Sequence, residues 1–138
     1  MEHKRLEVDA QKGLQPIEGL RNAAFKCGRI PLSLRQALFN GSGIIAEFKR
    51  KSPSRGWIHE DADPMKVIPE YCSGGASALS MLTDSEYFGG KLDYIKAVRP
   101  FAGIPILRKD FIIDPFQLYE ARLAGAECSW TKATTKYS

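Results

Sequence analysis

The sequence contains few of the residues that build metal sites and disulfide frameworks. Among its 138 residues are two histidines, His3 and His59, and three cysteines, Cys27, Cys72 and Cys128. The odd number and wide spacing of the cysteines argue against a disulfide framework. Neither histidine lies near a cysteine or the other histidine, as the ligands of a zinc site would. We therefore expect reduced thiols and no metal.

Long apolar runs are also missing. Those present are only a few residues long and are interrupted by charge, whereas about 20 consecutive apolar residues are needed to span a bilayer. The N-terminal stretch MEHKRLEVDAQKG is charged and lacks the apolar segment of a secretory signal. These features predict a cytoplasmic protein that does not associate with membranes.

The composition is that of an ordinary globular domain, with 43% hydrophobic and 26% charged residues. A net charge of +4 and a pI near 9.0 raise the question of an anionic partner. The basic residues are scattered and interleaved with acids, which favours a solvated surface over nucleic-acid binding. A small anionic substrate would also account for the charge, so we expect no nucleic-acid partner.

Short apolar runs alternate with helix signals along most of the chain. Residues 1–40 predict a helical prefix, which Gly13 and Pro16 interrupt. The predicted strands cover 44–49, 78–82 and 104–111, with a fourth from about 126, and the predicted helices cover 63–74, 91–99 and 115–125. Strands that alternate with helices on short connections indicate an α/β fold with a parallel sheet.

This alternation alone does not decide between an open, doubly wound sheet and a closed barrel. The first connection from strand to helix contains KSPSRG, which has neither the Gly-x-Gly-x-x-Gly run nor the Gly-Lys-Ser/Thr ending of nucleotide-binding loops. Since these fingerprints mark open nucleotide-binding sheets, their absence favours a (β/α)8 barrel.

Charged residues interrupt two of the predicted strands. Because side chains alternate across a strand, Glu47 and Lys49 share one face and Phe48 lies on the other. In a barrel the charged face lines the lumen, whose C-terminal mouth holds the active site. Lys109 has the matching place on the third strand, so we expect both lysines to converge on one ligand beside Glu47. Two nearby cations lower each other's pKa, which makes a lysine a usable proton donor near neutral pH.

The alternative for each of these residues is a solvated charge at a strand end without a specific role. Phe88, after the second predicted strand, also has two interpretations, a lid over the barrel rim or a wall for an aromatic substrate. The residues themselves favour neither. Ser52 lacks the neighbouring base that a nucleophile needs.

Three long stretches resemble the indole-3-glycerol phosphate synthase family. They are IIAEFKRKSPSRGWI (44–58), YCSGGASALSMLTDSEYFGG (71–90) and IPILRKDFIIDPFQLYEARLAGA (104–126). The resemblance implies a (β/α)8 TIM barrel with an N-terminal helical extension. It implies a carboxy-lyase of tryptophan biosynthesis, which closes the ring of 1-(2-carboxyphenylamino)-1-deoxyribulose 5-phosphate and releases carbon dioxide and water, without a metal or organic cofactor.

The resemblance also implies roles for individual residues. Lys109 would be the general acid that helps the substrate carbonyl accept attack by the aromatic ring. Glu47 and Lys49 would orient the substrate and assist proton transfer, with Lys49 near its anionic groups. The implied substrate-binding residues are Ser52 and Pro53 in the first loop and Phe88 and Phe111 at the aromatic end.

The C-terminal residues depart from this resemblance. A barrel of this kind takes about 200 residues or more, and the polar stretch ECSWTKATTKYS (127–138) resembles neither the family nor a buried strand. An altered reading frame or a truncated gene would produce such a change. We therefore expect an incomplete barrel of the first three to four βα units, divided into a helical extension (1–40), a partial barrel (41–127) and a divergent tail (128–138).

Two functional hypotheses follow from an incomplete barrel. The first is a member of this family that has little or no turnover alone, because the resemblance implies that strands five to eight carry further catalytic groups and the phosphate loops. The second is a non-catalytic half-barrel that works only by self-association or with a second half, because an open sheet has unpaired edges and an exposed apolar face.

Overall fold

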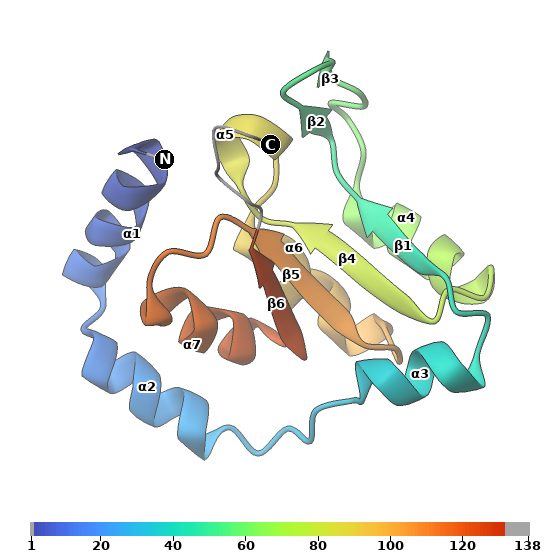
Figure 1. Ribbon diagram of the computed structural model, residues 1–138, viewed down its shortest axis with the longest axis horizontal. Coiled ribbons are helices and arrows are strands. Elements are labelled where there is room, and N and C mark those ends of the chain that lie inside the picture. The colour runs from blue at the N-terminus through green and yellow to red at the C-terminus, as the bar shows by residue number, and fades with distance from the viewer. Residues whose placement is uncertain (1, 132–138) are drawn as a thin grey trace.

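The computed structural model describes residues 2–131, in which helices flank a parallel sheet (Figure 1). The N-terminal part forms α1 (Glu2–Leu14), α2 (Ile17–Lys26) and α3 (Leu34–Asn40). The predicted interruption of the helical prefix is confirmed at Pro16, which lies between α1 and α2, whereas Gly13 lies inside α1. Within residues 2–131, no helix has both the length and the apolar character to cross a bilayer.

The main sheet has four parallel strands in the order β1-β4-β5-β6. These are β1 (Ile45–Phe48), β4 (Ala78–Leu82), β5 (Ile106–Asp110) and β6 (Cys128–Thr131). The helices between them are α4 (Pro64–Ser73), α6 (Leu92–Val98) with a 3-10 turn at Arg99–Phe101, and α7 (Pro115–Ala124). Successive strands are neighbours joined through helices, which confirms the predicted α/β class and fits a partial (β/α)8 barrel.

Two short elements lie where the sequence predicted only loops. A hairpin of β2 (Lys51–Ser52) and β3 (Gly56–Trp57) follows β1, and the single-turn helix α5 (Ser85–Phe88) follows β4. Both elements are too short to have a hydrophobic period, so the pattern that identifies longer elements is missing here.

The fourth strand begins at residue 128, close to the predicted start near residue 126. It pairs with β5 in parallel, with Leu107 opposite Cys128 and Lys109 opposite Trp130. The first four residues of the predicted divergent tail therefore belong to the sheet, although none of them is fully buried. The rest of that tail, residues 132–138, lies outside the described residues.

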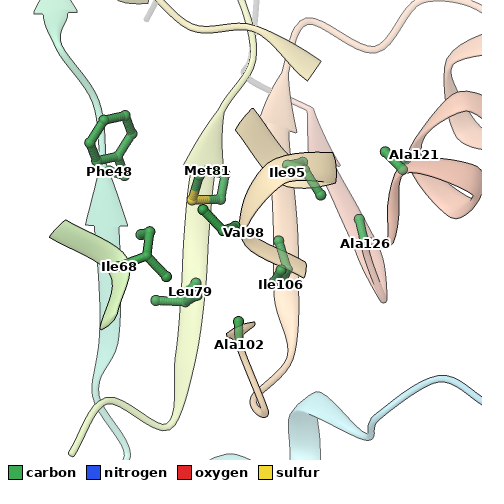
Figure 2. Close-up of a cluster of buried hydrophobic side chains, with 11 residues drawn as sticks. Phe48, Ile68, Leu79, Met81, Ile95, Val98, Ala102, Ile106, Ala121 and Ala126 are labelled. Carbon is green, nitrogen blue, oxygen red and sulfur yellow. The ribbon is translucent and has the colours of Figure 1, made fainter. Parts of the chain in front are cut away.

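The hydrophobic core lies between the sheet and its helices (Figure 2). Alternate strand residues enter it, including Phe48 from β1, Leu79 and Met81 from β4 and Ile106 from β5, where they meet Ile68 of α4. This is the apolar face that the sequence predicted for β1. The opposite face carries Glu47 and Lys109 and is the face that a closed barrel turns toward its lumen.

A buried carboxylate joins the N-terminal ends of β5 and β6 to the segments that follow α2 and α6. The side chain of Glu127 is 2% exposed and accepts hydrogen bonds from Arg29 at 2.7 Å, from Arg99 at 2.8 Å and from the backbone N–H of Ile106 at 2.6 Å. Arg29 belongs to the segment after α2, so the cluster of Glu127, Arg29 and Arg99 connects the N-terminal prefix to the sheet. The contacts also offset the cost of placing Glu127 away from water.

We expect Glu127→Ala to lower the free energy of unfolding by about 3 kcal/mol, because it leaves two partly buried guanidinium groups without their carboxylate. Chemical denaturation of the two proteins would measure the change. The control is Asp93→Ala, which breaks the exposed pair between Asp93 and Lys96 and should cost less than about 1 kcal/mol. Equal losses of unfolding free energy in the two variants would contradict a stabilising role for the contacts of Glu127.

Candidate functional site

Three charged side chains meet at the C-terminal end of the sheet, on the lumen face. Lys109 of β5 donates a hydrogen bond to Glu47 of β1 at 2.9 Å. Lys49, the residue that follows β1, lies 3.8 Å from the other carboxylate oxygen of Glu47. All three side chains are partly exposed. The two lysines predicted to converge are therefore brought together, with the carboxylate of Glu47 within ion-pair distance of both.

The strand register explains why these side chains meet. Phe48 is level with Met81, and Met81 is level with Arg108. One residue further along each strand, Lys49 and Lys109 consequently lie at the same height. Ser80 of the intervening β4 faces the same side and donates a hydrogen bond to Glu47 at 3.3 Å. Ser80 was not among the predicted site residues, because a serine in a fully buried apolar strand carries no sequence signal for function.

Helix α5 places Phe88 at the rim of this face. Asp84 caps the helix by accepting a hydrogen bond from the N–H of Tyr87, and Gly89 ends it with a left-handed φ of 63°. Gly90 then passes so close to β4 that an added Cβ would lie 2.0 Å from the carbonyl oxygen of Leu82. The buried Phe88 lies against Phe111, with 6.3 Å between ring centroids.

Further rings extend this aromatic contact to the N-terminal helix. Tyr87 meets Phe111 at 5.8 Å between ring centroids, and the imidazole of His3 packs edge-on against Tyr87 at 4.8 Å. Edge-to-face geometry at these distances is the favoured arrangement for aromatic pairs. Phe88 and Phe111, the two residues predicted at the aromatic end, thus lie together under the first turn of α1.

The first loop carries the other two predicted substrate-binding residues. Ser52 of β2 is buried and accepts a hydrogen bond from the N–H of Arg55, whereas Pro53 is exposed in the turn of the hairpin. Lys51 donates a hydrogen bond to the carbonyl of Glu86 and so joins the hairpin to α5. The hairpin and α5 therefore stand beside each other at the same end of the sheet (Figure 1).

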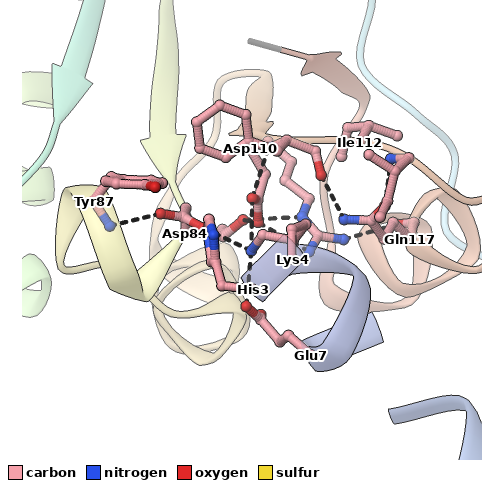
Figure 3. Close-up of polar contacts among 12 residues, drawn as sticks. His3, Lys4, Glu7, Asp84, Tyr87, Asp110, Ile112 and Gln117 are labelled. Atoms are coloured by element: carbon pink, nitrogen blue, oxygen red, sulfur yellow. Dashed lines mark hydrogen bonds and ion pairs between the residues drawn. The ribbon is translucent and has the colours of Figure 1, made fainter. Parts of the chain in front are cut away.

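A buried cation lies next to the aromatic rings. Lys4 of α1 is 1% exposed, and its Nζ lies 2.8 Å from Asp84, 3.0 Å from Asp110 and 3.0 Å from Glu7 (Figure 3). Burial alone lowers the pKa of Lys4, but attraction by Asp110, Asp84 and Glu7 outweighs burial and raises the pKa above its ordinary value. Lys4 was not predicted, because only its (i, i+3) pairing with Glu7 is visible in the sequence.

The arrangement supplies acid–base groups and a cation, but no cluster suited to a metal. Among residues 2–131, no group of three or more His, Cys, Asp or Glu side chains could hold a metal ion. Lys109 can donate a proton, Glu47 can accept one, and Lys49 can attract an anion. Together these groups suit proton transfer on an anionic substrate at the mouth of the sheet.

Comparison with known proteins identifies the family. The profile of the indole-3-glycerol phosphate synthase family matches residues 1–130. Relatives with that name include proteins of Bacteroides thetaiotaomicron, 50% identical over 91% of this chain, and of Carboxydothermus hydrogenoformans, 51% identical over 90%. A third, from Campylobacter fetus, is 52% identical over 89% of the chain.

The matched region is only part of each of these relatives. It covers 48% of the Bacteroides protein, 50% of the Carboxydothermus protein and 48% of the Campylobacter protein, so the chain spans about half the length of the curated relatives it matches. The family profile covers α1 and α2, the strands β1, β4 and β5, and the first three residues of β6. The chain belongs to the indole-3-glycerol phosphate synthase family.

Proposed function

We propose that the chain forms part of the active site for ring closure of 1-(2-carboxyphenylamino)-1-deoxyribulose 5-phosphate to indole-3-glycerol phosphate, with loss of carbon dioxide and water. The observation that carries the proposal is the contact of Lys109 and Lys49 with Glu47 at the C-terminal end of a parallel sheet. Active sites of (β/α)8 enzymes lie at this end. Membership of the family supports the choice of reaction.

In this proposal Lys109 is the general acid. It donates a proton to the substrate carbonyl oxygen while the aromatic ring attacks the carbonyl carbon, so the oxygen does not have to carry a full negative charge. Glu47 fixes the Lys109 ammonium through the 2.9 Å contact and assists later proton transfer. Lys49 attracts the anionic groups of the substrate.

The four aromatic and loop residues then bind the rest of the substrate. Phe88 and Phe111 contact the aromatic ring, and Ser52 and Pro53 shape the first loop around it. No metal or organic cofactor takes part in this proposal. The rings of Phe88 and Phe111 already lie in contact at the rim, which supports their assignment to the aromatic end.

We also propose that turnover requires four further strands. A (β/α)8 barrel closes with eight strands, and the main sheet within residues 2–131 has four. The remaining strands would supply groups on the far side of the substrate. The proposed division of the chain follows the same scheme, with a helical extension at 1–40 and a partial barrel at 41–127. Its free thiols suit a cytoplasmic location, which we propose for this chemistry.

We expect Lys109→Gln to reduce turnover by about 10²–10⁴-fold while leaving substrate affinity nearly unchanged, because a general acid acts mainly in the transition state. Product formation would be measured for the chain alone and for the chain mixed with a polypeptide covering the second half of the Bacteroides relative. Isothermal titration calorimetry would give the affinity for the substrate.

The control for this prediction is Lys96→Gln, which removes the same charge from an exposed position on α6 and should not alter turnover. Two outcomes would contradict the proposed function: no product from either preparation, or turnover that Lys109→Gln leaves intact. Full activity of the chain alone would contradict only the requirement for four further strands.

A second candidate function is that of a half-barrel that acts by self-association. The observation that favours it is that the two edge strands of the main sheet, β1 and β6, each pair with one neighbouring strand among the described residues. On the lumen face of these strands, Ile45 is 41% exposed and Trp130 is 59% exposed. In a dimer, β6 of each copy could pair with β1 of the other copy. The two four-stranded sheets would then form an eight-stranded barrel with twofold symmetry.

We expect the chain to self-associate over the micromolar to millimolar range, and Trp130→Lys to weaken the association by about tenfold or more by placing a charge on the lumen face. Sedimentation velocity at several concentrations would measure this. Phe101→Lys is the control, because Phe101 is 64% exposed but lies on the 3-10 turn after α6, away from the edge strands. A monomer at every concentration would rule out this function.

A further inference from the structure

Helix α1 contacts the rest of the protein through a few separate side chains, of which Lys4 and Val8 are buried. A hollow of about 510 Å³ lies between its middle part and the helices α6 and α7, lined by Gln11 and Lys96 among others. Beyond the first turn, α1 contributes Val8 to a small apolar cluster with Leu20 and Phe116, and Lys12 pairs with Asp114 at 2.9 Å. The contacts of Lys4 therefore provide much of what fixes the first turn.

Both buried partners of Lys4 control the backbone of segments that carry proposed site residues. Asp84 caps α5 through the N–H of Tyr87, and its carbonyl accepts a hydrogen bond from Gly90, so it brackets Phe88. Asp110 directly follows Lys109 and accepts a hydrogen bond from the N–H of Phe111 at 2.7 Å. One ammonium group thus contacts the carboxylates that organise both segments.

Lys4 is the cation that contacts both buried carboxylates of this cluster, Asp84 and Asp110. The side chains of Asp84 and Asp110 are 0% exposed. Arg108 lies 3.3 Å from Asp110, and Thr83 donates a hydrogen bond to the same oxygen of Asp110. On the other side His3 faces Asp84 at 3.5 Å. Without Lys4, Asp110 would keep Arg108, which also contacts Glu120, whereas Asp84 would keep the N–H of Tyr87 and the neighbouring His3. The two carboxylates would then repel each other in a site that excludes water.

We infer that Lys4 is a positioning residue of the proposed site: by joining Asp84 to Asp110 it holds Phe88 and the Lys109–Phe111 segment in register. The N-terminal helix thereby sets the geometry of the mouth without touching the reacting atoms. This inference rests on the proposed function for the identity of the site. The contacts of Lys4 with Asp84 and Asp110 can be tested without any measurement of turnover.

Amide hydrogen exchange of the Lys4→Met variant tests directly whether Lys4 holds these two segments in place. We expect the amides of residues 85–90 and 111–112 to exchange about tenfold faster or more, because uncompensated buried carboxylates favour local opening. Two variants on the same helix serve as controls. Arg5→Met removes an exposed charge next to Lys4, and Lys12→Met removes the other ion pair of α1. Neither control should change exchange in these two segments.

A second substitution separates the charge from the rest of the side chain. Adding Asp84→Asn to Lys4→Met removes one of the repelling charges and keeps a capping side chain for α5. Protection of residues 85–90 should recover, although α1 still lacks its lysine. Unchanged exchange in Lys4→Met, equal acceleration in Lys12→Met, or no recovery in the double variant would each overturn the inference.

If Lys4→Met does not fold, the double variant is compared with Asp84→Asn alone. The expected acceleration is then confined to residues 111–112, beside Asp110, and equal protection in the two proteins overturns the inference. In any preparation that forms product, kcat should fall by about 100-fold in Lys4→Met and stay unchanged in Lys12→Met, since a displacement of about 1 Å has an effect of this size. Hydrogen exchange can be measured whether or not product forms. Failure of the role inferred for Lys4 is therefore distinguishable from failure of the proposed function.

Discussion

Each strand of a parallel sheet sends alternate side chains to opposite faces, and both the core and the candidate site depend on this constraint. On β1, Phe48 enters the core beneath α4 and α6, so Glu47 before it and Lys49 after it must face the other way. The parallel register repeats the arrangement on β5, where Lys109 follows the buried Arg108. Core packing therefore fixes the height at which the charged groups meet.

Two buried ion clusters connect the N-terminal prefix to opposite ends of the sheet. Glu127 binds Arg29 at the ends where the strands begin, and Lys4 binds Asp84 and Asp110 where they finish. Buried ion pairs are costly to desolvate and add little net stability, but breaking one is strongly destabilising. Such clusters favour one placement of α1 and α2 over others. We propose that the extension at 1–40 folds together with the barrel units rather than as a separate domain.

The sequence was sufficient for the features that rest on regular periods. Short apolar runs that alternate with helix signals predicted the parallel sheet and its helices, and alternation within β1 predicted the face of Glu47. Contacts between distant segments had no such signal. Lys4 lies in an ordinary charged helix, and its partners Asp84 and Asp110 are about 80 and 106 positions away. Helix α5 is a single turn fixed by the Asp84 cap and the tight packing of Gly90, both of which are local geometry rather than pattern.

The contact between Glu47 and Lys109 spans only β1, β4 and β5, which are adjacent in the sheet. The carboxylate and the proposed acid are thus placed by strands that the described residues already contain, with Ser80 between them on β4. Further strands would not be needed to set this distance. They would be needed to enclose the substrate, because a proton donor on an open sheet competes with bulk water and its electrostatic effect is weakened by the solvent. Positioning and enclosure are therefore separate requirements of the proposed site, and this chain's own sheet meets the first.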